Sequence, residues 1–547
     1  MTDRELLSGN EAVALSAFHH GFFLATGYPG TPSTEILEYL SVISSASSNS
    51  VRAQWAPNEK VALEVGIGAA FAGARALVTM KHVGVNVAAD ALFSGAYTAI
   101  PGALVLVSAD DPGMASSQNE QDNRRYAIAS AIPVLEPADS QQAYDFLGLA
   151  VEIAERWQVP VMLRMTTRVC HGKSAVVSTA ERPTPSRPTY QRDFAGRVML
   201  PANARRAHRV LREKLAEIAV FAADPRITQH EPGQATLGVI CSGVTSNYVR
   251  EVAPDVSLLV LGMCHPPPND AIRQFVASVS RCIVIDEGDP ILLEATRCLG
   301  LVVDTIDEQY RFGEMNVERV REILTGEAVP EAQGPKGRPP ELCRGCSHRS
   351  VFAILAKHEL IVSGDIGCYT LAALPPFSAI DSVVCMGASI GIGLGMRHVL
   401  SDAEGHRVVS VIGDSTFVHS GITGLVEMVY NPPPSGHVVI VLDNETTAMT
   451  GQQEHPATGR NLSHARTTRL SIEGIARAVG VAWVEVIDPC AEGAHFEKTL
   501  LSMLESRRTA VIVARRPCLL ARKQLRTENR PRAEAALPAS QQWFEAD

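Results

Sequence analysis

One stretch of the chain, residues 408–450, constrains the fold more than any other. It reads VVSVIGDSTFVHSGITGLVEMVYNPPPSGHVVIVLDNETTAMT, with apolar runs at 408–412 and 438–442 on either side of a helix-like segment. Apolar runs without alternation are typical of strands that are buried on both faces, and a helix between two such strands makes a right-handed βαβ unit. The stretch therefore predicts a parallel sheet in an α/β fold.

A polar side chain follows each of the two predicted strands. Asp414 comes after the first and Asn444 after the second. The carboxyl ends of parallel strands meet at one edge of a sheet, where open α/β folds bind ligands. One carboxylate and one amide oxygen suit Mg²⁺, which completes its oxygen shell with water and ligand phosphates. Gly-Asp and Asp-Asn also follow strands in proteins without metal, so both readings stay open at this point.

A glycine-rich segment lies upstream, at residues 383–395, and reads VVCMGASIGIGLG. It predicts a strand that enters a helix start, where bare N–H groups and the helix dipole favour phosphate. Its spacing fits neither G-x-G-x-x-G nor the P-loop. A diphosphate bridged by Mg²⁺ would fit both this segment and the Asp414–Asn444 pair.

Four motifs in the C-terminal half together resemble a known family. They are CRGCSHR at 343–349, GDIGCY at 364–369, MGAS at 386–389 and GD at 413–414. They resemble the diphosphate-binding domain of thiamine diphosphate enzymes and, more closely, the α subunit of the indolepyruvate:ferredoxin oxidoreductase family. The resemblance covers nearly the whole chain.

The resemblance implies two cofactors, thiamine diphosphate and Mg²⁺. It places the metal on Asp414, Asn444 and the backbone carbonyl of Thr446. The other cofactor-binding positions that it implies are Tyr28, Cys346, His348, Gly367, Cys368, Gly387, Ala388, Ser389, Gly413 and Ser415.

The N-terminal region alternates strand-like and helix-like stretches, as a parallel sheet requires. Its turn at residues 27–33 reads GYPGTPS, and Ser33 or Thr34 is placed to cap the helix that follows. By itself this is a βα loop. The resemblance implies that the Thr31 hydroxyl contacts the cofactor or the substrate carboxylate.

Two acids occur early in a glycine- and alanine-rich helix, Glu59 and Glu64. They lie about 140° apart on the helix, so they do not serve one site. Thiamine diphosphate chemistry needs a carboxylate beside the aminopyrimidine ring, and we assign that role to Glu59, at the helix start. The alternative is that Glu59 only complements the helix dipole.

Lys81 and His82 stand at the carboxyl end of a predicted strand, residues 77–80. We expect His82 to contact the reacting centre, although a single histidine is also common as a hydrogen-bonded structural residue. The polar run at 116–125, SSQNEQDNRR, looks like an active-site loop in the family and like a solvated turn without it. The residues alone leave the roles of Arg124, Arg125, Arg164 and Arg168 open.

The predicted architecture is a multidomain α/β protein with a thiamine diphosphate-binding fold. We expect parallel-sheet pyrimidine-binding and diphosphate-binding domains at 1–180 and 338–525, a transketolase-C-terminal-like central domain at 195–325, and a C-terminal tail at 526–547. Pro-rich linkers separate the domains.

The chain departs from the family in two places. No ferredoxin-like domain with two 4Fe–4S clusters follows the final strand, and Arg344 and Ser347 stand where prolines are typical. Cys343 and Cys346 form the only C-x-x-C pair, and no C-x₂-C-x₂-C-x₃-C run occurs. We therefore expect no iron–sulfur cluster in this chain. The alternative is that Cys343, Cys346, Cys368 and Cys385, which lie in one predicted domain, converge by folding.

Composition excludes some other classes of protein. No run reaches the roughly 18 apolar residues of a membrane span. A charged start argues against a signal peptide, which indicates a cytoplasmic protein. The net charge of −10 argues against nucleic acid as a partner.

The function that the resemblance implies is oxidative decarboxylation of a 2-oxo acid, an aryl pyruvate such as indolepyruvate, to acyl-coenzyme A. Electrons would pass to an external ferredoxin. The implied assembly is a homodimer, a complex with a smaller γ-type (β) subunit, or both. Two alternatives remain: a non-oxidative decarboxylase or carboligase, and a non-catalytic subunit.

Overall fold

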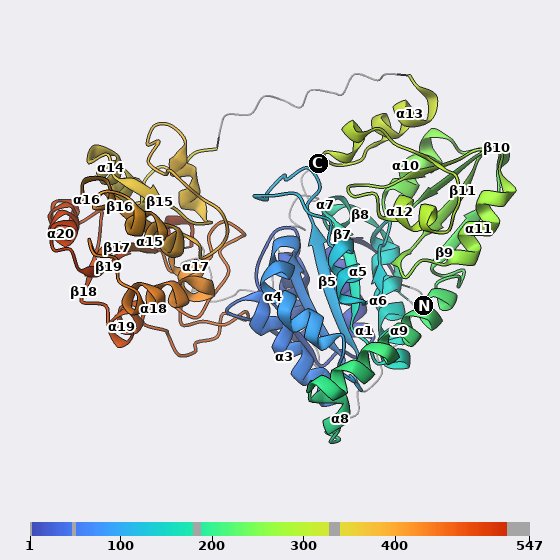
Figure 1. Ribbon diagram of the computed structural model, residues 1–547, viewed down its shortest axis with the longest axis horizontal. Helices are drawn as coiled ribbons and strands as arrows, with labels where there is room; N and C mark the ends of the chain where they lie inside the picture. Colours follow the sequence, from blue (N-terminus) through green and yellow to red (C-terminus); the bar gives the residue numbers. More distant parts are fainter. Residues whose placement is uncertain (1–2, 46–50, 179–187, 328–339, 522–547) are drawn as a thin grey trace. The chain divides into compact units, whose positions relative to one another are not determined.

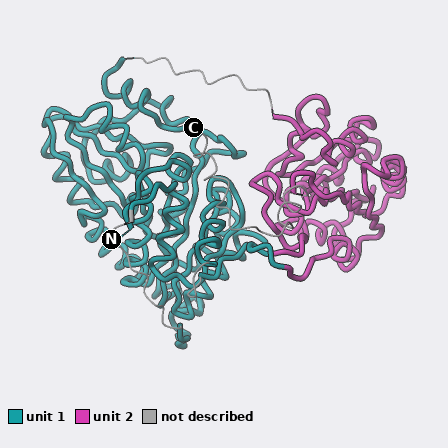
Figure 2. The backbone as a smooth tube through the Cα atoms, turned by 180° about the vertical axis from the view of Figure 1, so that it is seen from behind, with its two compact units in different colours: residues 1–337, 461–465 teal, residues 338–460, 466–547 magenta. Residues whose placement is uncertain are grey.

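The computed structural model describes residues 3–45, 51–178, 188–327 and 340–521. The chain forms two compact units, which are described separately below. The first comprises Met1–Gly337 with Asn461–Ala465, and the second comprises Arg338–Arg460 with Arg466–Asp547 (Figure 2).

A seven-stranded sheet forms the centre of the first unit, in the order β12-β6-β7-β5-β4-β2-β3 (Figure 1). Its strands are β2 (Leu24–Gly27), β3 (Arg52–Trp55), β4 (Ala76–Lys81), β5 (Leu104–Asp110), β6 (Val134–Leu135), β7 (Val161–Thr166) and β12 (Met263–His265). All neighbours are parallel except β12, which pairs antiparallel with β6. Every residue of β5 is buried, as the apolar run predicts for a strand covered on both faces.

Helices cover this sheet in two groups. The helix α1 packs against α2 and α6, and α3 packs against α4. The helices of this part are α1 (Gly9–His19), α2 (Thr34–Ser45), α3 (Glu59–Phe71), α4 (His82–Gly95), α5 (Arg124–Ser130), α6 (Ser140–Trp157), α7 (Thr167–His171), α8 (Phe194–Arg197) and α9 (Pro201–Phe221). The strands β1 (Asp3–Ser8) and β8 (Lys173–Ser178) form a separate antiparallel pair.

A second sheet in the same unit has the order β14-β13-β10-β11-β9. Its strands are β9 (Thr228–Glu231), β10 (Gln234–Cys241), β11 (Val256–Leu261), β13 (Cys282–Ile285) and β14 (Asp304–Thr305). Its helical segments are α10 (Thr245–Val252), α11 (Asn269–Ser278), α12 (Ile291–Cys298), η1 (Glu308–Arg311) and α13 (Val317–Thr325). The chain leaves β11 directly into β12, which extends the seven-stranded sheet, so backbone hydrogen bonds tie this second α/β layer to the first.

The second unit contains a five-stranded parallel sheet in the order β15-β16-β17-β19-β18. Its strands are β15 (Ile361–Ser363), β16 (Val408–Gly413), β17 (His437–Asp443), β18 (Trp483–Ile487) and β19 (Thr509–Arg515). Its helical segments are α14 (Ser347–Lys357), η2 (Cys368–Ala373), α15 (Ser389–Val399), α16 (Asp402–Gly405), α17 (Asp414–Thr416), η3 (Phe417–Gly421), α18 (Ile422–Tyr430), α19 (Ile472–Ala478) and α20 (Gly493–Glu505).

The two apolar runs of residues 408–450 form the centre of this sheet, as predicted. Val409 and Val411 of β16 pack into one hydrophobic cluster, and Ile412 packs into another on the opposite face. Val438 and Val439 of β17 divide in the same way. Both faces of the sheet are therefore apolar, and β16 and β17 run parallel on either side of a helical crossover.

The predicted strand at residues 383–384 is wrong. Val384 is 58% exposed, and the contact of this segment with the sheet is a single bridge between Ser382 and Ser363. The segment is instead a loop, because two of its backbone N–H groups bind a carboxylate that is described below.

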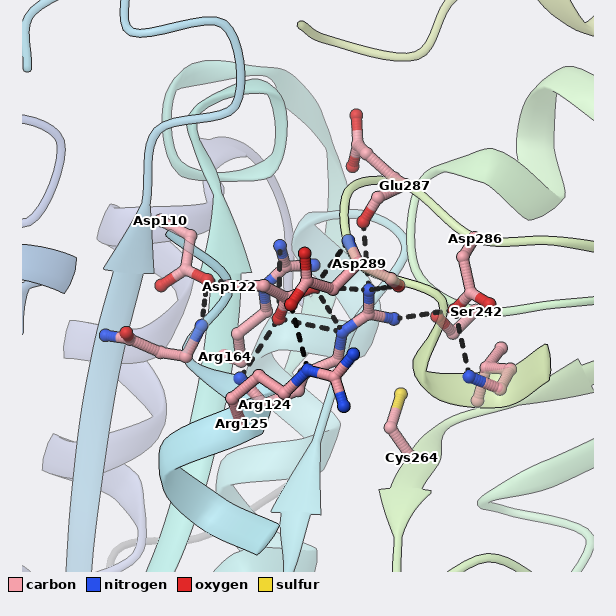
Figure 3. A network of polar contacts seen from close by, with 12 residues as sticks. Asp110, Asp122, Arg124, Arg125, Arg164, Ser242, Cys264, Asp286, Glu287 and Asp289 are labelled. Carbon is pink, nitrogen blue, oxygen red and sulfur yellow. Dashed lines mark hydrogen bonds and ion pairs between the residues drawn. The ribbon is translucent and has the colours of Figure 1, made fainter. Parts of the chain in front are cut away.

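Two buried arginines link the two sheets of the first unit (Figure 3). Arg124, at the start of α5, forms ion pairs with Asp122 at 2.5 Å and with Asp286 at 3.3 Å. Its guanidinium also donates to the carbonyl of Glu287 at 2.9 Å. Asp286 and Glu287 follow β13, so the ion pairs join the first sheet to the second.

Arg164, on β7, completes this network. It pairs with Asp110 at 2.9 Å and with Glu136. Glu136 also accepts hydrogen bonds from Ser242, which follows β10 of the second sheet, and from Cys264 on β12. The structure thus gives a structural role to two of the arginines whose roles the sequence left open. The other two form exposed ion pairs: Arg125 with Asp289 and Glu294, and Arg168 with Glu314.

The carboxylates of this network differ in their affinity for protons. Burial raises the pKa of Asp286 to about 6, although Arg124 opposes the shift. Burial likewise raises the pKa of Glu287 to about 7, against the charge of Arg164. Burial acts in the same sense on Asp122, but Arg124 and Arg164 outweigh it and lower the pKa of Asp122 to about 2.

The solvated-turn reading of residues 116–125 is wrong at its C-terminal end. Asp122, Asn123 and Arg124 are buried. Their polarity matches partners that come from distant parts of the chain, which a local composition cannot reveal.

Among the described residues, no helix is long and apolar enough to cross a membrane.

Replacing Arg124 with Met should destabilise the first unit by about 3–5 kcal/mol, because Asp122, Glu136 and Asp286 would lose a buried counter-charge. Replacing Arg125 with Met should cost less than about 1 kcal/mol, since its partners are solvent-exposed. The free energy of unfolding of each variant is measured by urea denaturation, with hydrogen exchange of the α5 amides as the probe. Equal losses in the two variants would contradict the assignment.

Candidate active site

The first unit presents a set of polar residues at the carboxyl ends of β2, β4 and β5. After β2 the chain turns through Tyr28, which is buried, to the start of α2. The hydroxyl of Ser33 donates to the carbonyl of Gly30 at 2.9 Å, and the hydroxyl of Thr34 accepts from the N–H of Gly30 at 3.0 Å. Both side chains brace the loop that carries Thr31.

Glu59 is the first residue of α3 and is 6% exposed. Gly84, in the first turn of α4, lies directly against it. A Cβ atom on Gly84 would stand 2.6 Å from Oε1 of Glu59, so only glycine lets the chain after β4 approach this carboxylate. Glu64 lies elsewhere on the helix: it is exposed and pairs with Lys60.

His82 is fully buried at the start of α4. Its Nε2 lies 3.2 Å from the carbonyl oxygen of Asn119 and 3.3 Å from the side-chain oxygen of the same residue. Its Nδ1 has no hydrogen-bond partner among the described residues. Nε2 therefore holds the loop after β5, and Nδ1 is left to bind a ligand or water.

That loop, residues 111–123, is fixed at both ends. Asp111 accepts hydrogen bonds from the N–H of Ser116 at 2.9 Å and the hydroxyl of Ser117 at 2.5 Å. At the far end, the amide of Asn123 donates to the carbonyl of His82 at 3.0 Å. Burial acts to raise the pKa of Asp111, but the hydrogen bonds from Ser117 and Ser116 outweigh it and lower the pKa.

The second unit brings together the residues predicted to bind the metal. Asp414 and Asn444 follow the neighbouring parallel strands β16 and β17 and are both buried. The Oδ2 atom of Asp414 accepts from the N–H of Glu445 at 2.8 Å, which links the two strand ends. The Oδ1 atom of Asn444 accepts from the N–H of Thr446 at 3.1 Å.

Two histidines lie beside this pair. Nε2 of His455 is 3.3 Å from Oδ2 of Asp414. Burial acts to raise the pKa of Asp414, but His455 and the backbone donors at Ser415 and Glu445 outweigh it, so the pKa lies below its usual value. Nε2 of His348 is 3.4 Å from the amide nitrogen of Asn444, and burial lowers the pKa of His348 to about 4. The family resemblance implied a role for His348, whereas no local pattern pointed to His455.

The glycine-rich start of α15 is not bare, which corrects the prediction from the sequence. The carboxylate of Asp365 accepts hydrogen bonds from the N–H groups of Gly387 at 2.7 Å and Ser389 at 2.9 Å. The N–H of Ala388 donates to the carbonyl of Cys385 at 3.1 Å. An internal carboxylate thus takes the place expected for a phosphate. The motif GDIGCY contained Asp365, but nothing in its spacing indicated this partner.

Three further predicted cofactor-binding positions lie close to Asp414. Gly413 donates its N–H to the hydroxyl of Tyr369 at 2.9 Å, and Ser415 donates its N–H to Oδ1 of Asp414 at 2.8 Å. Gly367 precedes η2, and its N–H donates to the hydroxyl of Thr370 at 3.2 Å.

Four cysteine thiols come together in this unit: those of Cys343, Cys346, Cys368 and Cys518. Burial raises the pKa of Cys368 to about 11, and the charges of Cys346, Cys518 and Cys343 add to the shift. Burial also raises the pKa of Cys346, again with contributions from Cys343 and Cys518. The N–H of Cys518 donates to the carbonyl of Asn444 at 2.9 Å, so the segment that carries the fourth cysteine lies beside the end of β17.

The expectation that this chain holds no iron–sulfur cluster stays a prediction. The sequence showed a single C-x-x-C pair, and the cysteine that completes the group is about 150 residues farther along the chain than Cys368. Within the described ranges, no three His, Cys, Asp or Glu side chains are arranged to hold a single metal ion. A four-iron cluster spaces its ligands more widely than a single ion does, so the two findings are compatible.

Two family models match the chain. Residues 16–206 match "Pyruvate flavodoxin/ferredoxin oxidoreductase, thiamine diP-bdg", and residues 365–514 match "Thiamine pyrophosphate enzyme, C-terminal TPP binding domain". The first match contains Glu59 and His82, and the second contains Asp414 and Asn444. Each of the two units therefore contains a match to a thiamine diphosphate-binding domain.

Close relatives match almost the whole chain, and each is called indolepyruvate oxidoreductase subunit IorA. The protein of Methanothermobacter thermautotrophicus is 38% identical over 95% of this chain and 87% of its own length. Those of Archaeoglobus fulgidus and Thermococcus kodakarensis are 37% and 35% identical, over 95% of this chain and 87% and 86% of their own lengths. The chain belongs to the family of indolepyruvate oxidoreductase subunit IorA, among the thiamine diphosphate-dependent 2-oxoacid:ferredoxin oxidoreductases.

Proposed function

We propose that this chain carries out the oxidative decarboxylation of an aryl pyruvate, such as indolepyruvate, to acyl-coenzyme A. The observation that carries the proposal is the pairing of Asp414 with Asn444 at adjacent strand ends of a matched diphosphate domain. The names of the relatives support the choice of an aryl pyruvate.

Mg²⁺ fits the oxygen atoms of this pair. Asp414 offers a carboxylate, Asn444 an amide oxygen and Thr446 a backbone carbonyl, which are the hard ligands that Mg²⁺ prefers. Too few protein oxygens are present to fill an octahedral shell, so phosphate oxygens of the cofactor and water would complete it. We assign the remaining predicted positions in this unit, among them Cys346, His348 and the loop at 387–389, to the cofactor's surroundings.

Thiamine diphosphate would supply a nucleophilic carbon and an acceptor for the electron pair released with CO₂. The chain's own task is to hold protons and to exclude water. Glu59 would hold the proton at the aminopyrimidine ring, since it is a buried carboxylate at the strand edge of the other matched domain. Tyr28, Thr31 and His82 border the same edge, and we assign Thr31 and His82 to contacts with the reacting molecule.

The four thiols support an oxidative outcome. Four cysteine thiolates are the ligand set of a 4Fe–4S cluster, and such a cluster would accept the electrons that decarboxylation leaves behind. We propose Cys343, Cys346, Cys368 and Cys518 as its ligands, in place of the cluster-free chain expected from the sequence. An external ferredoxin, coenzyme A, a smaller γ-type subunit and a second copy of this chain are the proposed partners.

Replacing Asp414 with Ala should weaken the Mg²⁺-dependent binding of thiamine diphosphate by at least about 100-fold, because the diphosphate charge loses its metal bridge. Asp402→Ala is the matched control, since that aspartate of the same unit is exposed and pairs with Arg507. Titration calorimetry measures both affinities. An unchanged affinity in the Asp414 variant would show that the metal lies elsewhere.

Replacing Glu59 with Gln should slow exchange of the cofactor's C2 proton by about 10²–10⁴-fold and leave cofactor affinity nearly unchanged, since an amide cannot relay the proton. Glu64→Gln, on the exposed side of the same helix, should exchange at the normal rate. Proton exchange followed by NMR gives both rates. The reverse pattern would transfer the role to Glu64.

The whole reaction can be tested anaerobically with the chain, its small subunit, indolepyruvate, coenzyme A, thiamine diphosphate, Mg²⁺ and a viologen dye. We expect dye reduction, acyl-coenzyme A and about four iron atoms per chain. Cys368→Ser should lose iron and dye reduction, whereas Cys490→Ser, at an exposed thiol, should keep both. Rapid aldehyde release without dye reduction in any mixture would instead identify a non-oxidative decarboxylase.

A further inference from the structure

A lysine without a counter-charge lies at the reacting edge of the first unit. The ammonium of Lys81, the last residue of β4, donates to the carbonyl of Ser116 at 2.6 Å. Within the part of the chain that the structure describes, no carboxylate lies within ion-pair distance of it. The charge of Asp111 acts on Lys81, but the oxygens of Asp111 already accept hydrogen bonds from Ser116, Ser117 and Thr167.

One glycine packs against Lys81, and a second lies three residues after it in the chain. A Cβ atom on Gly30 would stand 3.1 Å from Cβ of Lys81 and 3.7 Å from its Cδ, so the loop before Thr31 packs against the lysine stem. Three residues after Lys81, Gly84 lies against the carboxylate of Glu59. Lys81 therefore lies between the Thr31 loop and the proposed proton-relay glutamate.

A half-buried cation in this position is unfavourable by itself. Burial lowers the pKa of Lys81, and Asp111 opposes the shift only from a distance. Removing a charge from water without a partner costs free energy, and an anionic ligand would offset that cost. Every 2-oxo acid carries a carboxylate next to the ketone that reacts.

We infer that Lys81 binds the carboxylate of the 2-oxo acid, with the Thr31 hydroxyl as a second donor, and so turns the adjacent ketone toward the cofactor. The inference rests on the proposed function and adds a residue that determines which class of substrate is held. An ammonium at this point selects acids over the corresponding aldehydes.

The chemistry gives this contact a distinctive kinetic signature. As the bond to the carboxyl carbon breaks, its electron pair stays with the former ketone carbon, and the carboxylate becomes neutral CO₂. Until that bond breaks the carboxylate keeps its charge, so the attraction to Lys81 is about equal in the bound substrate and in the transition state for attack on the ketone. Loss of the lysine should raise KM and leave kcat nearly unchanged.

A purely structural role for Lys81 predicts a different result. If the lysine only fastened the loop through Ser116, its loss would disturb Asn119 and His82, and with them cofactor activation. Lys214 offers a matched control, because it too is half-buried, has a pKa lowered by burial and donates to a carbonyl, that of Gln158 at 3.3 Å. It lies on α9, away from the strand ends.

The experiment compares Lys81→Met, Lys81→Arg and Lys214→Met in the complete complex, with CO₂ release from indolepyruvate as the assay. We expect Lys81→Met to raise KM at least about tenfold, as loss of one charge-assisted hydrogen bond implies, with kcat within about threefold. Lys81→Arg should restore most of the affinity, and Lys214→Met should behave as wild type. Binding of indoleacetaldehyde, which has no carboxylate, should be the same in all four proteins.

Three measurements separate the possible failures. An unchanged KM in Lys81→Met would overturn the inference, and so would a rise in KM accompanied by weaker thiamine diphosphate binding or slower C2 proton exchange. An equal loss of indoleacetaldehyde binding would also overturn it. If the wild-type complex binds the cofactor and exchanges the C2 proton but releases no CO₂ from any 2-oxo acid, the proposed function itself fails.

Discussion

The buried contact between two guanidiniums and the carboxylates around them is the interaction on which the first unit depends. Arg124 and Arg164 join the ends of β5 and β7 to the turn after β13. The same contact holds Asn123 in place, and Asn123 binds the carbonyl of His82. His82 belongs to the turn from Lys81 to Gly84, so this hydrogen bond also helps to hold Gly84 against Glu59. The reacting edge therefore takes its shape from an ion cluster that lies behind it.

The sequence predicted what local patterns encode. Two valine-rich runs were sufficient to place Asp414 and Asn444 at neighbouring strand ends, because parallel register follows from strands buried on both faces. It failed where partners are far apart in the chain. Asp122 and Arg124 stand in a run that reads as a solvated turn, and their partner Asp286 is more than 160 residues away. Their burial depends on how β12 docks the second layer, which no local pattern states.

The same limit explains the errors in the second unit. Residues 383–395 have the composition of a strand and a phosphate-binding helix start, but Asp365 competes for the N–H groups and bends the segment into a loop. Cysteine spacing along the chain did not point to Cys518, because the final strand and the segment beside Asn444 bring that residue near Cys368. The motifs therefore predicted functional residues in this unit, but the contacts of those residues depend on segments that are distant in the sequence.

The ion cluster of the first unit is also unequal in charge. Within the described residues, the ion pairs of Asp110, Asp122, Glu136 and Asp286 are made with Arg124 and Arg164. Burial raises the pKa of Asp286 to about 6 and that of Glu287 to about 7. Carboxyls whose pKa is raised by folding bind more protons in the folded chain than in the unfolded one. Closing the second layer onto the first therefore takes up protons from solution near neutral pH. This contribution to the union of the two layers is largest in mild acid and is lost as the pH rises through about 6 to 7, which couples the rigidity of the reacting edge to the proton supply around it.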